Sequence, residues 1–120
     1  MSAQKVLVIE DDALLAFEMQ DVLAGAGYEV IGPAATIAKA LQLIGAHDID
    51  AAFVDCNLDC GPATAVVERL TAKKIPFVVV TGSARESLPP EFSNAAFVRK
   101  PFNTAGLLKA ARRLLTGDEE

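Results

Sequence analysis

The sequence predicts an α/β protein built on one open, parallel, doubly wound sheet of five strands. Short apolar runs, too short for helices, alternate along the chain with longer amphipathic stretches. The apolar runs are almost continuous, as in parallel strands that helices cover on both faces. The loops between the segments are short, which favours right-handed βαβ units within one sheet.

The composition fits a single domain with a real core. The chain has 120 residues, of which 52% are hydrophobic. Its formal charge is −5 and no Lys/Arg cluster is longer than two, which disfavours binding to nucleic acid. No apolar run reaches the roughly 18 residues that span a bilayer, and the N-terminus lacks a signal-peptide core. We therefore expect one cytoplasmic domain over residues 1–120, with no effector domain and no membrane or nucleic-acid partner.

The spacing of apolar residues and the candidate capping residues predict where the strands and helices lie. Strands are expected at 5–9, 28–32, 50–54, 77–80 and 95–98. Helices are expected at about 12–25, from Thr36 as N-cap through Ile44, from Ala63 through Leu70, and at about 103–116. Between the last two strands, Pro89 and Pro90 leave room for only a short or irregular fourth helix.

Three carboxylates follow the first strand, and a fourth follows the third strand. In an open parallel sheet, ligands lie outside the carboxyl ends of the strands, so Glu10, Asp11 and Asp55 should meet at one edge. Such a set of hard oxygen ligands suits Mg²⁺, whose charge offsets their mutual repulsion. Alternatively, the acids after the first strand only start a helix. For Asp12 this alternative weighs as much as metal binding, because Asp12 is the best N-cap candidate.

Asp55 can also act as a nucleophile toward phosphorus and form an acyl phosphate. The transferred group then needs a fixed cation, and Lys100 after the fifth strand is placed to supply it. Thr81 after the fourth strand could donate a hydrogen bond to a phosphoryl oxygen, although a lone Thr at a strand end is usually a packing residue. Strand alternation points Arg99 to the opposite face, where it would be surface charge.

Together, the stretches VLVIEDD, FVDCNL, VVVTGS and FVRKPF resemble those of a response-regulator receiver domain, in the family's order and over essentially the whole chain. The resemblance implies a flavodoxin-like sheet of strand order 2-1-3-4-5. It implies that Glu10 and Asp11 hold Mg²⁺, that Asp55 is the phosphoacceptor, and that the backbone carbonyl of Asn57 is a further metal ligand.

The resemblance also implies a conformational switch. Thr81 would be the switch hydroxyl, Lys100 the lysine typical of the family, and Lys100–Pro101 a cis peptide bond. Phe97 falls where the family has its switch aromatic. The alternative for Phe97 is an ordinary core residue of a strand.

One segment is similar to a subgroup of this family. IPFVVVTGS followed by LPPEF resembles a PFxFATGY-like motif, whose owners are typically stand-alone receivers with a remodelled fourth helix. These proteins work beside histidine kinases of the HWE or related types. The chain departs from the motif at Val79, Val80 and Ser83, which shifts the expected switch role toward Phe97.

The expected function is that of a single-domain response regulator. A sensor histidine kinase or a histidine phosphotransferase would pass a phosphoryl group to Asp55, catalysed by the receiver itself with Mg²⁺. About two added negative charges would then switch a protein-interaction surface, or the phosphate would be passed on. Asn57 and Ser83 flank the site and would modulate hydrolysis of the acyl phosphate.

Two alternatives stay open. A small aspartate-nucleophile phosphatase would need a second carboxylate where the chain has Asn57, and also a substrate-covering cap. A receiver-like interaction domain could work unphosphorylated, through Cys56 or loop contacts. Cys56 and Cys60 are too few for a disulfide framework or a four-cysteine zinc site, so reduced thiols are expected, and His47 is expected in a loop.

Overall fold

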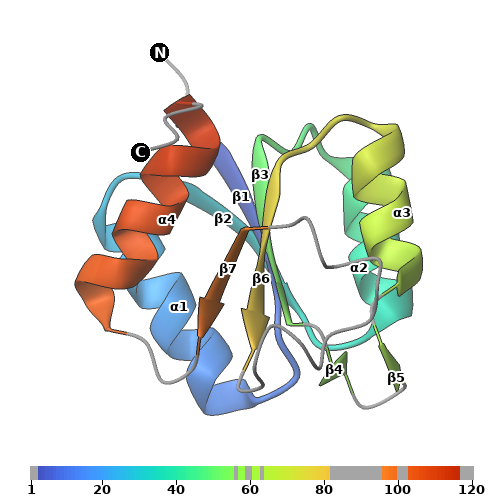
Figure 1. The fold of residues 1–120 in the computed structure, drawn as a ribbon, viewed down its shortest axis with the longest axis horizontal. Coiled ribbons are helices and arrows are strands. Elements are labelled where there is room, and N and C mark those ends of the chain that lie inside the picture. The colour runs from blue at the N-terminus through green and yellow to red at the C-terminus, as the bar shows by residue number, and fades with distance from the viewer. Residues whose placement is uncertain are drawn as a thin grey trace.

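The five main strands form one parallel sheet of order β2-β1-β3-β6-β7, which is 2-1-3-4-5 along the chain (Figure 1). This is the predicted fold. The structure is a computed structural model that describes residues 3–55, 57–58, 61–62, 64–81, 96–99 and 103–116. The strands of the sheet are β1 (Lys5–Ile9), β2 (Glu29–Ala34), β3 (Ala51–Asp55), β6 (Phe77–Thr81) and β7 (Ala96–Arg99).

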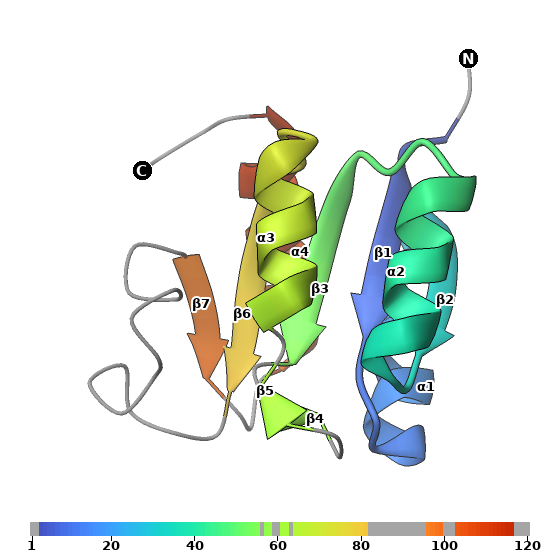
Figure 2. The same ribbon diagram turned by 90° about the vertical axis from the view of Figure 1, so that its right-hand side faces the viewer.

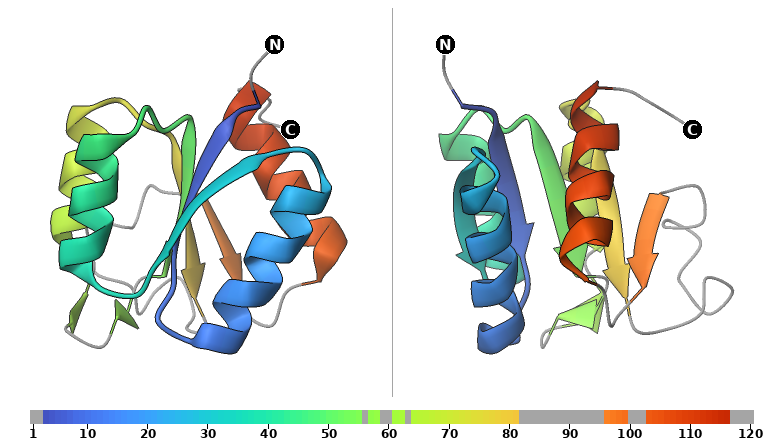
Figure 3. Two further views of the ribbon diagram at one scale, coloured as in Figure 1. Left: turned by 180° about the vertical axis from the view of Figure 1, so that it is seen from behind. Right: turned by 90° about the vertical axis from the view of Figure 1, so that its left-hand side faces the viewer.

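Four helices in the described part of the chain cover the two faces of the sheet. They are α1 (Ala13–Gly25), α2 (Ile37–Ala46), α3 (Thr64–Ala72) and α4 (Thr104–Thr116). Helices α2 and α3 lie on one face (Figure 2), and α1 and α4 lie on the other (Figure 3). A short antiparallel pair, β4 (Asn57–Leu58) and β5 (Gly61–Pro62), follows the carboxyl end of β3.

The central strands are apolar because both of their faces are buried. In β1, Leu7 and Ile9 pack toward α2 and α3, whereas Val6 and Val8 pack toward α1 and α4. In β3, Phe53 packs on the same side of the sheet as Val6 and Val8. Its strand neighbours Ala52 and Val54 pack on the other side, with Leu7 and Ile9. The near-continuous apolar runs are therefore explained by two cores, one on each side of the sheet.

Asp12 and Thr36, the two predicted N-caps, each cap a helix, and so does Asn103, where the sequence predicts the last helix to begin. Side-chain oxygens of Asp12, Thr36 and Asn103 accept hydrogen bonds from backbone N–H groups two or three residues later, at 2.7 to 3.2 Å. These bonds satisfy amide donors that have no partner inside the helix. For Asp12, helix capping is thus confirmed.

Strand β2 is longer than predicted because pairing resumes beyond an irregularity. Leu7 pairs with Ile31, but Ile9 pairs with Ala34, so Gly32 and Pro33 form a bulge whose peptide bond is cis. Gly32 has φ +101°, and a Cβ there would lie 2.9 Å from the Val8 carbonyl oxygen. Only glycine fits this position.

Two expectations lie outside the described residues. The short or irregular fourth helix falls in the interval 82–95, and the cis peptide bond falls at Lys100–Pro101. Both stay predictions.

Candidate functional site

Three carboxylates converge at the carboxyl edge of the sheet. Strands β1 and β3 are adjacent, and Ile9 pairs with Val54, so the residues that follow them emerge side by side. One oxygen each from Glu10, Asp11 and Asp55 can be chosen so that all three lie within 4.8 Å of one another. Glu10 is 2% exposed and Asp55 is 5% exposed, whereas Asp11 is half-buried.

This arrangement favours a cation. Two unit charges 4.8 Å apart repel by roughly 3 kcal/mol at an effective dielectric constant of about 20. A divalent ion among the three oxygens replaces that repulsion with attraction. Carboxylate oxygens are hard ligands, which Mg²⁺ and Ca²⁺ prefer. The donor set of Glu10, Asp11 and Asp55 therefore fits the Mg²⁺ that the sequence predicts.

Backbone contacts fix the position of Glu10. Its N–H donates to the Ala34 carbonyl at 2.9 Å, and its side-chain Oε2 accepts from the Asp12 N–H at 3.1 Å. Ala34 is the last residue of β2, beyond the bulge. The irregular end of β2 thus helps to hold a ligand of the candidate metal site.

Asp12 has a different role from its two neighbours. Its Oδ1 accepts from Leu14 N–H at 3.0 Å and from Leu15 N–H at 3.2 Å, as the N-cap of α1. Among the described residues, the acidic cluster contains Asp11 and not Asp12. Asp12 therefore caps α1, whereas its neighbour Asp11 belongs to the acidic cluster.

Strands β6 and β7, which carry Thr81 and precede Lys100, end at the same edge of the sheet as Asp55. Asp55 pairs with Val80, so Thr81 follows one position beyond the pair. Thr81 in turn pairs with Arg99, the residue before Lys100. The backbone therefore brings Thr81 to the edge that holds Asp55. Lys100 lies outside the described residues, as does the side chain of Thr81.

For two further predicted residues only the backbone is described. Phe97 pairs with Val79 inside the sheet, and Asn57 opens β4, two residues after Asp55. Their roles as switch aromatic and as carbonyl ligand stay predictions. Cys56, Cys60 and Ser83 lie outside the described residues, and His47 is the C-cap of α2.

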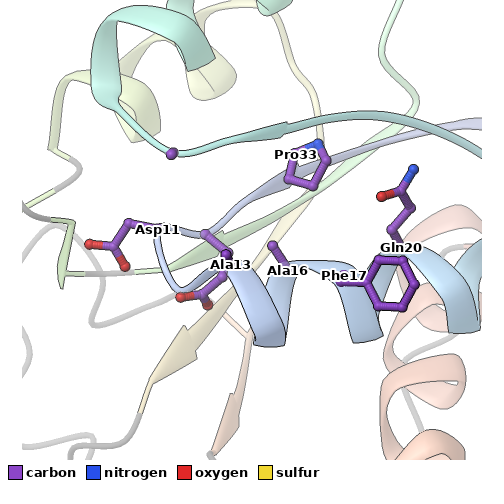
Figure 4. Close-up of a pocket in the computed structure, with 8 residues that line it drawn as sticks. Asp11, Ala13, Ala16, Phe17, Gln20 and Pro33 are labelled. Atoms are coloured by element: carbon purple, nitrogen blue, oxygen red, sulfur yellow. The ribbon is translucent and has the colours of Figure 1, made fainter.

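Sequence reasoning missed a pocket beside the acids. It has a volume of about 340 Å³, and Figure 4 shows Asp11, Phe17 and Pro33 among the residues around it. Glu10 also lines it. A signal was present, since Phe17 lies outside the stripe of α1 that contains Leu15 and Met19. A large apolar residue off the buried stripe of an amphipathic helix is a candidate for contact with another molecule.

Comparison with known families identifies the chain. Residues 6–112 match the family described as the response regulator receiver domain. The match covers both the sheet and the acidic cluster, so the chain belongs to this family.

Individual proteins are also similar to this chain in structure or in sequence. The solution structure of SdrG from Sphingomonas melonis Fr1 is 37% identical, with a TM-score of 0.82 over 96% of this chain and 99% of that one. The BeF3-activated conformation of SdrG is 38% identical, with a TM-score of 0.81 and the same coverage. The transcriptional regulatory protein PdtaR of Mycobacterium tuberculosis is 28% identical over 89% of this chain. The chain spans 54% of the length of PdtaR.

None of the helices that the structure describes has the length and apolarity needed to span a bilayer.

Proposed function

We propose that this receiver domain accepts a phosphoryl group from a protein phosphohistidine onto Asp55. Glu10, Asp11 and Asp55, together with the backbone carbonyl of Asn57, would hold the Mg²⁺ that the reaction needs. The observation that supports this most directly is the convergence of three carboxylate oxygens within 4.8 Å at the carboxyl edge of the sheet. The phosphodonor would be a histidine kinase or a histidine phosphotransferase, and the subgroup resemblance favours a kinase of the HWE type.

The chemistry is a displacement at phosphorus. A carboxylate oxygen of Asp55 attacks, the bond between phosphorus and the imidazole nitrogen breaks, and the electron pair of that bond returns to the imidazole. Bound Mg²⁺ would supply positive charge to the phosphoryl oxygens. Because Asp55 is almost fully buried, few water molecules can reach its carboxylate. Lys100 would neutralise the oxygens that face away from the metal.

Signalling would follow from the added charge. About two negative charges at Asp55 would draw the Thr81 hydroxyl and Lys100 toward the phosphoryl group. Phe97 would move with them, and a protein-binding surface near β7 would change. Alternatively, the acyl phosphate would pass its phosphoryl group to another histidine, and Asn57 would modulate its loss to water.

The experiment uses a small phosphodonor, phosphoramidate, with Mg²⁺. Intact-protein mass spectrometry should show one added phosphoryl group on the wild type and none on Asp55→Asn. Asp48→Asn is the matched control, because Asp48 is an exposed acid in the loop before β3 and should be phosphorylated like the wild type. An equal mass increase in Asp55→Asn would contradict the proposal.

A further inference from the structure

A short hairpin follows β3, the strand that ends at Asp55. Its strands β4 and β5 pair antiparallel, with Asn57 opposite Pro62 and Leu58 opposite Gly61. Figure 2 shows this pair beyond the carboxyl end of β3. The hairpin therefore determines how the backbone of Asn57 is oriented, and the carbonyl of Asn57 is the one that the proposed function uses as a metal ligand.

The proline identifies the hydrogen-bonded pair of the hairpin. In an antiparallel ladder, pairs of facing residues alternate between those that exchange backbone hydrogen bonds in both directions and those that exchange none. Proline has no backbone N–H, so Asn57 and Pro62 cannot be a pair of the first kind. Leu58 and Gly61 are therefore the hydrogen-bonded pair, and they close the hairpin as a two-residue loop.

This arrangement leaves the Asn57 carbonyl outside the ladder. At a pair that exchanges no hydrogen bonds, the backbone N–H and C=O groups point away from the facing strand. The carbonyl oxygen of Asn57 thus points away from β5 and can act as a ligand. Mg²⁺ requires oxygen ligands in near-octahedral positions, so a carbonyl whose direction the hairpin already fixes loses little freedom on binding.

A residue with an N–H at position 62 would permit a second kind of hairpin. Hairpins also close around four residues, and here the four-residue loop would make Asn57 and residue 62 the hydrogen-bonded pair. The Asn57 carbonyl would then accept the N–H of residue 62 and would have to give up that bond to reach a cation. Pro62 excludes this hairpin, because proline cannot donate to a ladder.

We propose that Pro62 is a positioning residue for the metal site, because it restricts the β4–β5 hairpin to the arrangement in which the Asn57 carbonyl stays available to a cation. This inference rests on the proposed function, in which that carbonyl is a Mg²⁺ ligand. Pro62 acts through Asn57 and needs no contact of its own with the metal. Its effect falls on the affinity for Mg²⁺, and through that affinity on phosphorylation at low Mg²⁺.

Two substitutions that change backbone donors test this role. Pro62→Ala supplies the N–H that the second hairpin needs, and it should raise the Kd for Mg²⁺ by about fivefold, the factor expected from competition with one backbone hydrogen bond. Gly61→Pro removes the N–H that Gly61 donates to the Leu58 carbonyl, so the hairpin opens and the Kd should rise at least as much. Isothermal titration of the full chain with MgCl₂ measures both values.

Pro76→Ala is the matched control for removal of a proline. Pro76 is exposed before β6, and its carbonyl, which alanine retains, accepts the Ala52 N–H at 3.0 Å. This variant should bind Mg²⁺ like the wild type. Pro62 is not part of the five-stranded sheet, so the thermal stability of Pro62→Ala should also stay close to that of the wild type.

NMR and kinetics separate positioning from a general structural effect. In the wild type, the carbon-13 resonance of the Asn57 carbonyl should shift on addition of Mg²⁺ by more than that of the Leu58 carbonyl, which already accepts a hydrogen bond in the hairpin. At saturating Mg²⁺, Pro62→Ala should be phosphorylated by phosphoramidate within about twofold of the wild-type rate, because only metal binding is weakened. At Mg²⁺ concentrations below the wild-type Kd, Pro62→Ala should be slower.

Three results would overturn the proposal. One is a Mg²⁺ Kd that neither Pro62→Ala nor Gly61→Pro changes. Another is a shift on Mg²⁺ addition at the Leu58 carbonyl with none at the Asn57 carbonyl. The third is an equal loss of affinity in Pro76→Ala, because the effect would then not belong to the hairpin. Failure of the proposed function itself looks different, since phosphoramidate would not label Asp55 of the wild type at any Mg²⁺ concentration.

Discussion

Glu10 directly follows β1 and Asp55 is the last residue of the neighbouring parallel strand β3, and both carboxylates are almost fully buried with oxygens within 4.8 Å of each other. The pairing of Ile9 with Val54 causes this proximity, since each acid is the next residue along the chain. Buried like charges destabilise a fold unless something compensates them. The relationship therefore predicts that a cation bound among these carboxylates would stabilise the domain.

Mg²⁺ should stabilise the folded protein. At a concentration 100 times its dissociation constant, an ion that binds only the folded state adds about 2.7 kcal/mol to the free energy of unfolding. Chemical denaturation with and without MgCl₂, at matched ionic strength, measures this increase. Asp11→Asn should unfold at higher denaturant than the wild type without Mg²⁺, because one repulsive charge is gone, and it should gain less from Mg²⁺. Identical unfolding curves with and without the ion would argue against a metal site.

Asp12→Ala should affect folding and leave the candidate metal site intact. The substitution removes the acceptor for the Leu14 and Leu15 N–H groups and should cost about 1 kcal/mol of stability, as is usual for an N-cap. Because Asp12 is outside the acidic cluster, the Mg²⁺ dissociation constant should change little. Asp12→Asn keeps the cap and serves as control. A large loss of Mg²⁺ affinity in both variants would instead make Asp12 a ligand.

Gly32→Ala should damage both the fold and the candidate metal site. The new Cβ would lie 2.9 Å from the Val8 carbonyl oxygen at a φ of +101°, so the destabilisation should exceed about 1 kcal/mol. The bulge would shift Ala34, whose carbonyl accepts the Glu10 N–H, and Mg²⁺ affinity should fall. Isothermal titration with MgCl₂ and thermal unfolding test the two effects.

Gly45→Ala is the matched control for this substitution. Gly45 lies in α2, and a Cβ there meets no atom within 4 Å. Since alanine favours the helix, this variant should be more stable by up to about 1 kcal/mol. Equal effects of the two substitutions would show that the bulge does not need glycine.

The sequence predicts the fold well because the two buried faces of the sheet leave a strong periodic signal. Thr36 and Asn103 mark helix starts through a local hydrogen bond, so neighbouring residues suffice to find them. The meeting of Glu10 with Asp55 follows from strand order, which the βαβ rule restricts.

Other features depend on contacts that sequence does not encode locally. The continuation of β2 beyond Gly32 depends on a bulge against Val8, and a proline usually signals the end of a strand. The pocket lined by Asp11, Phe17 and Pro33 depends on how α1 packs beside the end of β2, which the helical pattern alone does not determine. For Lys100, the sequence motif stays the basis of the assignment.

Lys73 should stabilise the face of the domain opposite α1. Its Nζ donates to the Ile44 carbonyl at 3.0 Å, so a residue just after α3 satisfies a carbonyl in the last turn of α2 and places a positive charge at the negative end of that helix. Lys73→Met keeps most of the apolar stem and removes this bond, and the free energy of unfolding should fall by about 1 kcal/mol. Denaturant unfolding measures the change, with Lys39→Met as control because only the backbone N–H of Lys39 bonds to Thr36. Mg²⁺ affinity should be unchanged in both variants. The acidic cluster lies at the carboxyl edge of the sheet, whereas Lys73 contacts the last turn of α2. If Lys73→Met weakened Mg²⁺ binding, the α2–α3 face and the metal site would have to be energetically coupled.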